Sequence, residues 1–274
     1  MMIQRDFYPG SEWLYCKIFC GFKSAEKILA NDILELVLEN EEYYTKFFFI
    51  RYSEDFPHFR LRFYNENKDQ LYIIQKKLFS KLYPHFESGV VHKVSLDTYK
   101  REISRYKNEL ITEVETIFYH DSLAVLKMIH LFGEIEDPEK YRMLMSLRGI
   151  DSLLSDFKLS IDEKHIFSKR IQQSFFREFG GSPNLQQQLN DKYRAQSKII
   201  FSHMDSAKDE ENAIEEAVCF YNIRSEFIRD TAIYIKERLT SIEELYDLLS
   251  SLIHMFMNRL FLSQNRKYEL LIYH

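Results

Sequence analysis

The chain has 274 residues, of which 45% are hydrophobic and 15% aromatic, so it is long enough to bury a substantial core. A formal net charge of -5 argues against a general nucleic-acid-binding protein. Seven glycines and five prolines are few for this length and favour long helices over a turn-rich all-β fold.

No apolar stretch reaches the length of about 20 residues that a membrane span needs, and the N-terminus has no basic region followed by an apolar core. We therefore expect a cytoplasmic protein. The three cysteines are Cys16, Cys20 and Cys219. Cys16 and Cys20 share a strand face but lack a second pair of ligands, which favours buried thiols over a metal site. We predict no metal and no cofactor.

The first hundred residues alternate strand and helix patterns. Strands are expected at 13–22, 46–52, 58–64 and 89–96, and helices from residue 24 and over 67–82. Residues 53–57 have the composition of a hairpin turn. The order β-α-β-β-α-β is that of the split βαβ, ferredoxin-like arrangement, in which two helices cover one face of an antiparallel sheet.

After residue 108 the pattern is helical. Helices are expected at 111–132, 138–157, 160–179, 184–204, 209–237 and 241–262. The sequence therefore predicts an α+β protein, with a ferredoxin-like sheet region at 1–108 and a helical bundle at 109–274 packed against it. No linker separates the two regions, so we expect one domain over 1–274.

A row of cations marks one of the predicted strands. Alternation with apolar residues places His58, Arg60 and Arg62 on the same strand face. If the apolar side chains pack against helices, these three project from the other face as donors that can hold a carboxylate. Arg51 ends the neighbouring apolar run and is a further candidate. The alternative is a set of solvated residues on an exposed sheet face.

Two more arginines, Arg101 and Arg105, lie four residues apart. Their alternative partners along a helix are Glu102, Glu109 and Glu113. Glu115 and the pair Asp121 and Ser122 are suited either to capping helices or to orienting the arginines.

The last predicted helix carries polar residues inside an apolar stretch. His254 and Asn258 lie one turn apart on the same helix face, and Arg259 follows. One interpretation is a buried histidine satisfied by local hydrogen bonds. The other is a general acid or base, because histidine titrates near neutral pH.

The sequence contains no P-loop, dinucleotide fingerprint, serine-hydrolase elbow or zinc-protease motif. Six ordered segments instead resemble the C-terminal, elimination domain of lantibiotic dehydratases and the stand-alone thiopeptide-type bacteriocin biosynthesis proteins. The matching segments are 13–21, 48–52, 57–63, 97–106, 115–118 with 121–122, and 254–260.

This resemblance implies a lyase of peptide natural-product (RiPP) biosynthesis. In the family, glutamate from glutamyl-tRNA esterifies serine or threonine of a precursor peptide, and the elimination domain expels it to leave dehydroalanine or dehydrobutyrine. The implied partners are the precursor peptide, with its leader and glutamylated core, and a separate tRNA-dependent glutamylation protein. Direct contact with nucleic acid is not expected. A homodimer is left open.

The resemblance also implies roles for individual residues. Arg62 and His254 match catalytic positions of the family, and a third arginine matches either Arg101 or Arg105. We further expect Arg51, His58, Arg60, Asn258 and Arg259 to bind the substrate. The family usually has glycine after the tyrosine at Tyr106, where this chain has Lys107 and Asn108, so we expect Asn108 to adopt the turn conformation.

Two other functions remain in view. Some stand-alone members of the family are pyridine synthases, which join two dehydroalanines by a formal aza-[4+2] cycloaddition and release the leader peptide. The presence of both Arg62 and His254 favours elimination. A chain that only binds the precursor peptide, through an exposed strand edge, is the non-enzymatic alternative.

Overall fold

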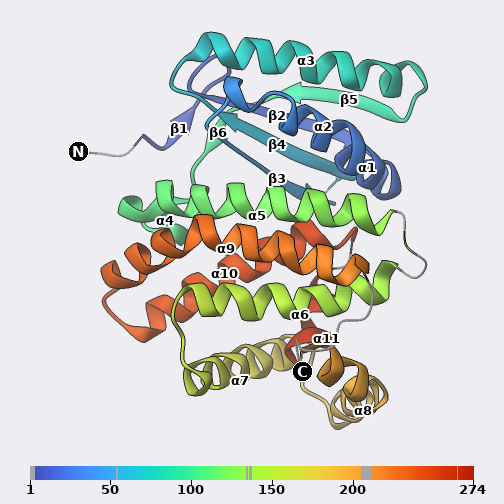
Figure 1. Ribbon diagram of the computed structural model, residues 1–274, viewed down its shortest axis with the longest axis vertical. Coiled ribbons are helices and arrows are strands. Elements are labelled where there is room, and N and C mark those ends of the chain that lie inside the picture. Colours follow the sequence, from blue (N-terminus) through green and yellow to red (C-terminus); the bar gives the residue numbers. More distant parts are fainter. Residues whose placement is uncertain (1–3, 54, 134, 136–137, 205–211, 264) are drawn as a thin grey trace. The chain divides into compact units, whose positions relative to one another are not determined.

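The structure is a computed structural model that describes all residues except 1–3, 54, 134, 136–137, 205–211 and 264. The chain forms two compact units, 1–134 and 135–274 (Figure 1). The protein is α+β, as predicted, and every strand in the described part of the chain belongs to unit 1. The division follows residue 134, whereas the sequence placed the change from sheet to helices after residue 108.

A four-stranded antiparallel sheet forms the centre of unit 1. Its strands are β2 (Trp13–Cys20), β3 (Lys46–Tyr52), β4 (His58–Tyr64) and β5 (Val91–Leu96), arranged in the order β3-β4-β2-β5. The strands at 46–52 and 58–64 have the predicted boundaries. The predicted turn between them includes Glu54, which lies outside the described residues.

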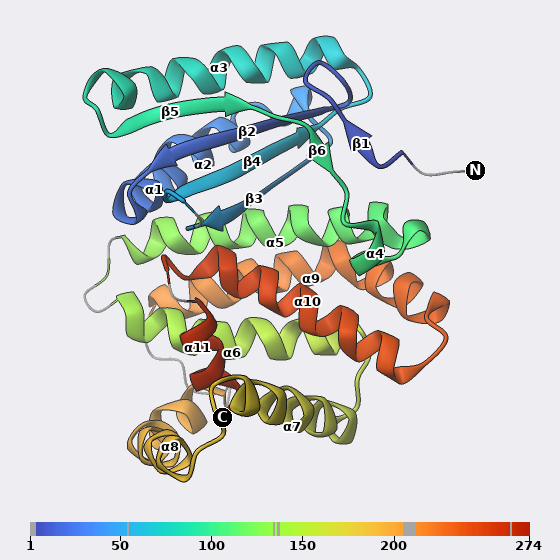
Figure 2. The ribbon, with the colours of Figure 1, turned by 180° about the vertical axis from the view of Figure 1, so that it is seen from behind.

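Helices cover one face of this sheet. The first set is α1 (Phe22–Ile28), a π-helical turn (Leu29–Ile33) and α2 (Leu34–Leu38), followed by a 3-10 turn (Glu41–Tyr43). The second is α3 (Lys68–Glu87), whose first turn is capped by the side chain of Asn67. Cys16, Ile18, Phe49 and Leu61 are fully buried on the helix-covered face. Figure 2 looks onto the other face, where the strands lie in front of α1 and α2.

Helix α5 (Ile111–Phe132) runs beside the edge strand β3 in both ribbon views (Figures 1 and 2). The backbone N–H of Phe49 in β3 donates to the hydroxyl of Ser122, 3.3 Å away. The rings of Phe48 and Phe118 lie 5.5 Å apart. Because α5 covers and hydrogen-bonds an edge that would otherwise be open, it belongs to the same compact unit as the sheet.

Short elements outside the four-stranded sheet differ from the prediction. Strands β1 (Asp6–Phe7) and β6 (Tyr99–Lys100) form a separate antiparallel pair. Arg101 follows β6, and Arg105 belongs to α4 (Ile103–Tyr106), so the two arginines do not share one helix.

The turn after Tyr106 also differs from the expectation. Lys107, not Asn108, adopts the positive φ of 58°, and Asn108 begins a 3-10 turn (Asn108–Leu110) instead. Because the backbone changes direction directly after α4, the strained positive φ occurs at Lys107, one residue before the expected Asn108.

Unit 2 is helical throughout its described residues. Its helices are α6 (Pro138–Asp156), α7 (Ile161–Glu178), α8 (Pro183–Met204), α9 (Asn212–Arg238), α10 (Ile242–Leu260) and α11 (Asn265–Tyr273). Residues 209–211 of the predicted fifth helix lie outside the described residues, and α11 was not predicted. A capping box between Ser160 and Glu163 starts α7, and Ser241 caps α10. None of the described helices has the length and apolar character needed to cross a membrane.

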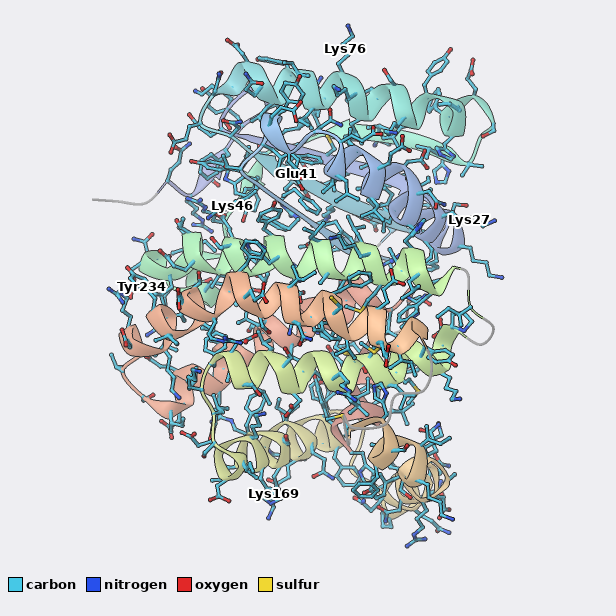
Figure 3. All side chains as sticks on the ribbon, in the orientation of Figure 1. Lys27, Glu41, Lys46, Lys76, Lys169 and Tyr234 are labelled. Atoms are coloured by element: carbon cyan, nitrogen blue, oxygen red, sulfur yellow. The ribbon has the colours of Figure 1, made fainter. Side chains whose placement is uncertain are left out.

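The surface and interior cations differ in their surroundings. Lys27, Lys76 and Lys169 are exposed and project from α1, α3 and α7 (Figure 3). Arg51 and Arg62 of the sheet are only 6% exposed. A buried arginine requires either a charge partner or a ligand, so the arginines of the sheet are candidates for a binding site.

The pKa of His120 in α5 gives a testable consequence of burial within unit 1. Burial, together with the positive charge of Lys46, lowers the pKa of His120 from 6.5 to about 4. The unfolded chain therefore binds a proton before the folded protein does, and stability falls as the pH drops from about 6.5 to 4. We expect a loss of about 2 kcal/mol over this range, allowing for partial exposure of the ring.

The measurement is urea unfolding of wild type and His120→Gln across this pH range. The variant lacks the titrating ring, so its stability should fall less steeply. Identical pH dependence of the free energy of unfolding in the two proteins would contradict the lowered pKa of His120.

Candidate active site

Arg62 lies in an aromatic cage on the sheet face that is not covered by α1 and α2. Its guanidinium carbon is 4.4 Å from the ring centre of Tyr15, 5.0 Å from that of Phe48 and 4.9 Å from that of Tyr99. Tyr15 in β2 and Phe48 in β3 are its direct cross-strand neighbours. The strand register thus builds two walls of the cage, and β6 supplies the third.

Hydrogen-bond donors inside this cage are unsatisfied. Nε and Nη1 of Arg62 are buried without a hydrogen-bond partner among the described residues, and so is Nε1 of Trp13. The Trp13 ring lies 5.5 Å from Phe48 and 5.1 Å from Tyr99, both of which also contact Arg62. Cation–π contacts stabilise the charge but give the N–H groups no acceptor. This arrangement is suited to an anion that brings its own acceptor oxygens.

His58 and Arg60 form a second group on the same face. Nε of Arg60 donates to Nε2 of His58 at 3.1 Å, and Nδ1 of His58 lies 2.9 Å from the carbonyl oxygen of Phe56. Arginine only donates and a carbonyl only accepts, so the His58 proton resides on Nδ1. The guanidinium of Arg60 stacks 3.3 Å above the ring of Tyr52. His58 therefore orients Arg60.

Arg51 lies apart from this row. It pairs across the sheet with Phe59 and so shares the helix-covered face. There its Nη2 forms a 2.5 Å ion pair with Oε2 of Glu26 in α1. The sequence grouped Arg51 with the other strand cations, but the pleat sends it to the opposite face.

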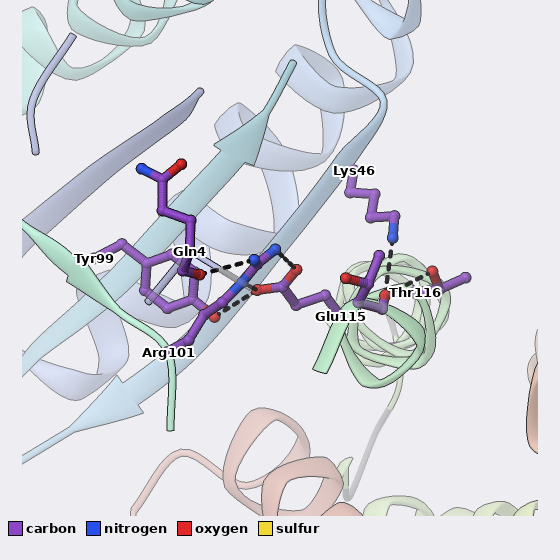
Figure 4. A network of polar contacts seen from close by, with 7 residues as sticks. Gln4, Lys46, Tyr99, Arg101, Glu115 and Thr116 are labelled. Carbon is purple, nitrogen blue, oxygen red and sulfur yellow. Dashed lines mark hydrogen bonds and ion pairs between the residues drawn. The ribbon is translucent and has the colours of Figure 1, made fainter. Parts of the chain in front are cut away.

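Arg101 is held by a buried carboxylate. Its Nε and Nη2 donate to the two oxygens of Glu115 at 2.7 and 2.6 Å, and Nη1 donates to the carbonyl of Gln4 at 3.1 Å (Figure 4). Tyr99 donates to the same carboxylate at 2.9 Å. Burial alone would lower the pKa of Arg101, but the hydrogen bonds and charge of Glu115 raise it above its usual value. Glu115 thus orients an arginine, one of the two roles that the sequence suggested.

Arg105 has a different environment. Its side chain is 41% exposed, and Nη1 lies 3.4 Å from Oε2 of Glu102, the residue that precedes α4. Of the two arginines that matched the family segment, Arg101 is therefore the buried one with a fixed geometry, and Arg105 is the accessible one.

The cysteines of β2 lie on the helix-covered face. Burial raises the pKa of Cys16 to about 12 and that of Cys20 to about 11. Both thiols stay protonated at neutral pH, whereas metal binding uses the thiolate. Within the described residues, no group of three or more histidine, cysteine, aspartate or glutamate side chains is placed to hold a metal ion.

Unit 2 contains a second polar group, centred on His254 of α10. Nδ1 of His254 lies 2.7 Å from Oε1 of Glu269, which is 0% exposed. Nη1 of Arg266 donates to Oε2 of Glu269 at 3.0 Å, and Arg266 also pairs with Glu178. The His254 side chain is 27% exposed, so its ring is both held and reachable.

The sequence did not predict Glu269. Its helix, α11, is only nine residues long, and the contact with His254 joins two helices. The one local signal is the three-residue spacing of Arg266 and Glu269, which favours an ion pair on a helix. Asn258 lies one turn after His254 and is partly exposed, whereas Arg259 is completely buried.

The chain was compared with known protein families, curated proteins and solved structures. Residues 13–274 match the family described as lantibiotic biosynthesis dehydratase C-term. The chain belongs to this family of C-terminal dehydratase domains.

Individual relatives extend this result. The chain is 25% identical over 260 residues to the subtilin biosynthesis protein SpaB of Bacillus subtilis, a match that covers 92% of the chain and 24% of that protein. The chain thus spans about a quarter of the length of this relative. The tRNA-dependent lantibiotic dehydratase MibB from Microbispora sp. 107891 has a similar fold, with a TM-score of 0.69 and 20% identity over 97% of the chain and 28% of MibB.

Two solved structures of similar length share the fold. TsrL has a TM-score of 0.66 and 11% identity, with 96% of the chain and 93% of TsrL covered. The pyridine synthase TbtD from thiomuracin biosynthesis has a TM-score of 0.62 and 12% identity, with 95% of each chain covered. At these identities the likeness concerns the fold.

The ion pair of Arg101 and Glu115 gives a direct test of the description of unit 1. Glu115→Ala leaves Arg101 buried without its charge partner, which should lower the free energy of unfolding by about 3 to 5 kcal/mol. Glu102→Ala is the matched control, because it removes the half-exposed partner of Arg105 and should cost less than about 1 kcal/mol. Chemical denaturation of the three proteins measures both effects, and equal losses in the two variants would refute the distinction between the arginines.

Proposed function

We propose that this chain is a lyase that eliminates glutamate from glutamylated serine or threonine residues of a precursor peptide, leaving dehydroalanine or dehydrobutyrine. The observation that carries the proposal is the buried guanidinium of Arg62, whose Nε and Nη1 have no acceptor among the described residues. Membership in the dehydratase C-terminal family supports a glutamyl ester as the source of the anionic group that Arg62 would bind.

The elimination requires a base and stabilisation of negative charge. A base removes the α-proton of the esterified residue, the electron pair forms the Cα=Cβ double bond, and the Cβ–O bond breaks so that glutamate leaves as a carboxylate. We assign proton removal to Nε2 of His254, since Nδ1 faces Glu269. We assign binding of the anionic groups to Arg62, with Arg60 beside it on the sheet face.

The remaining candidates receive supporting roles in this proposal. Arg101 is fixed by Glu115 and shapes the cage through Tyr99, whose hydroxyl shares that carboxylate. Arg105 is accessible for a carboxylate of the substrate. We assign Arg51 to packing within unit 1, because Glu26 already neutralises it.

The proposal covers the elimination step only. We propose a tRNA-dependent glutamylation protein as the source of the ester substrate. The precursor peptide is the proposed partner of this chain. The strand order β3-β4-β2-β5, with helices on one face, supports a ferredoxin-like arrangement of unit 1.

A pyridine synthase is the second candidate. It is favoured by the likeness to TbtD, which covers 95% of both chains. A cycloaddition needs two dehydroalanines that are already formed, so such an enzyme would leave a glutamyl ester intact.

The test is mass spectrometry of a leader-bearing peptide with a glutamyl-serine ester, incubated with wild type, His254→Ala and Arg62→Lys. We expect wild type to release glutamate and each variant to be at least about 100-fold slower. Lysine keeps the positive charge at position 62 but lacks the planar fork. Lys93→Ala is the matched control, because this exposed cation lies on the same sheet face outside the Arg62 cage and should not affect the rate.

Two outcomes would contradict the elimination proposal. An ester that survives wild-type protein while the leader peptide binds would rule out elimination, and a second substrate with two dehydroalanines would then test cycloaddition. Full activity of His254→Ala would remove the proton-transfer role of this histidine.

A further inference from the structure

We infer that Glu269 is a positioning residue that keeps the proton of His254 on Nδ1 and so leaves the lone pair on Nε2. The inference rests on the proposed function, in which His254 removes the α-proton. It adds a residue, and a specific protonation pattern, that the family resemblance did not supply.

The geometry around Glu269 permits one hydrogen-bonding pattern. Its carboxylate is completely buried and receives Nη1 of Arg266 on Oε2 at 3.0 Å. The other oxygen, Oε1, lies 2.7 Å from Nδ1 of His254. An ionised carboxylate only accepts hydrogen bonds, so Nδ1 must be the donor. A neutral His254 then has its lone pair on Nε2.

Arg266 is the charge partner of this carboxylate. Burial alone would lower the pKa of Arg266, but the hydrogen bonds and charges of Glu178 and Glu269 raise it above its usual value. A permanent cation therefore faces Glu269 at 3.0 Å. This pairing offsets the cost of burying the carboxylate in unit 2.

The same contact assists the reaction after proton transfer. When Nε2 takes up the α-proton, the ring becomes an imidazolium, and its positive charge lies against the negative charge of Glu269. A buried carboxylate behind a histidine both orients the ring and stabilises its protonated form. Glu269 acts through His254 and need not touch the substrate.

Glutamine at position 269 would reverse the pattern. Arg266 can only donate, so it would claim the single oxygen of the amide. The amide NH2 group would then face Nδ1 of His254, which would have to accept. The proton would move to Nε2, where the lone pair is needed. Glu269→Gln should therefore keep the size of the side chain but give His254 the wrong tautomer.

The first measurement is 15N NMR of protein labelled at histidine, with the His254 signal assigned by comparison with His254→Ala. Wild type should show a protonated Nδ1 and an unprotonated Nε2 in the neutral ring, and Glu269→Gln the reverse. This spectrum does not depend on turnover, so it tests the positioning role even if the proposed elimination fails. Wild type with its proton on Nε2 would overturn the inference.

Kinetics with the glutamyl-serine ester peptide give the second readout. Glu269→Gln should lower kcat by at least about 100-fold with little change in KM, as expected for loss of the correct tautomer. The double variant Arg266→Met with Glu269→Gln frees the amide oxygen to accept from Nδ1. It should regain the wild-type tautomer and recover at least about tenfold in kcat relative to Glu269→Gln.

Glu178→Gln is the matched control. Glu178 pairs with the other side of Arg266 and is 51% exposed, so this change should alter neither the tautomer nor kcat by more than about twofold. Circular dichroism establishes that each variant is folded. A folded Glu269→Gln protein with wild-type kcat would overturn the inference, as would a double variant whose tautomer stays reversed. If Glu269→Gln does not fold, the wild-type spectrum alone decides.

Discussion

The arrangement of the cationic sheet face depends on one buried carboxylate, Glu115. It accepts two hydrogen bonds from Arg101 and one from Tyr99, and Arg101 in turn donates to the backbone of Gln4. These contacts tie the start of the chain and strand β6 to helix α5. Tyr99 is at the same time a wall of the cage around Arg62. The charge of Glu115 is balanced by Arg101, so the neighbouring Arg62 has an aromatic cage but no carboxylate among the described residues.

Two buried arginines of unit 1 have different roles. Arg101 stabilises the fold, and Arg62 has hydrogen-bond donors that can bind a ligand. Arg101 has the fixed, bidentate geometry of a structural ion pair. Arg62 is held by the faces of three rings, which leave two of its N–H groups unsatisfied. Leaving such donors buried costs free energy in the absence of a ligand, and an anion with acceptor oxygens recovers it. A carboxylate on a peptide substrate would supply the acceptor oxygens that the Arg62 donors lack.

The sequence predicted the features that follow from local periodicity. Alternation around Arg62 gave both the strand and the face on which its side chain lies. The neighbouring run before Arg51 is continuously apolar and does not alternate, so its facing depended on pairing with β4. The two-residue strands β1 and β6 exist only through pairing between distant parts of the chain, and their sequence has no strand signal. Glu269 depends in the same way on a contact between two helices, and the positive φ at Lys107 on the turn that joins α4 to the next element.

The central claim is that Arg62 is a preformed site for the anionic group of the substrate, and the single tryptophan of the chain gives direct access to it. Trp13 shares the rings of Phe48 and Tyr99 with Arg62, so its fluorescence reports on the cage. The measurement is a fluorescence titration of the His254→Ala protein, which leaves the ester unreacted, with the glutamyl-serine ester peptide. The account predicts a saturable change, weakened at least about tenfold when Arg62 is also changed to Gln. Identical titration curves with and without Arg62 would contradict it.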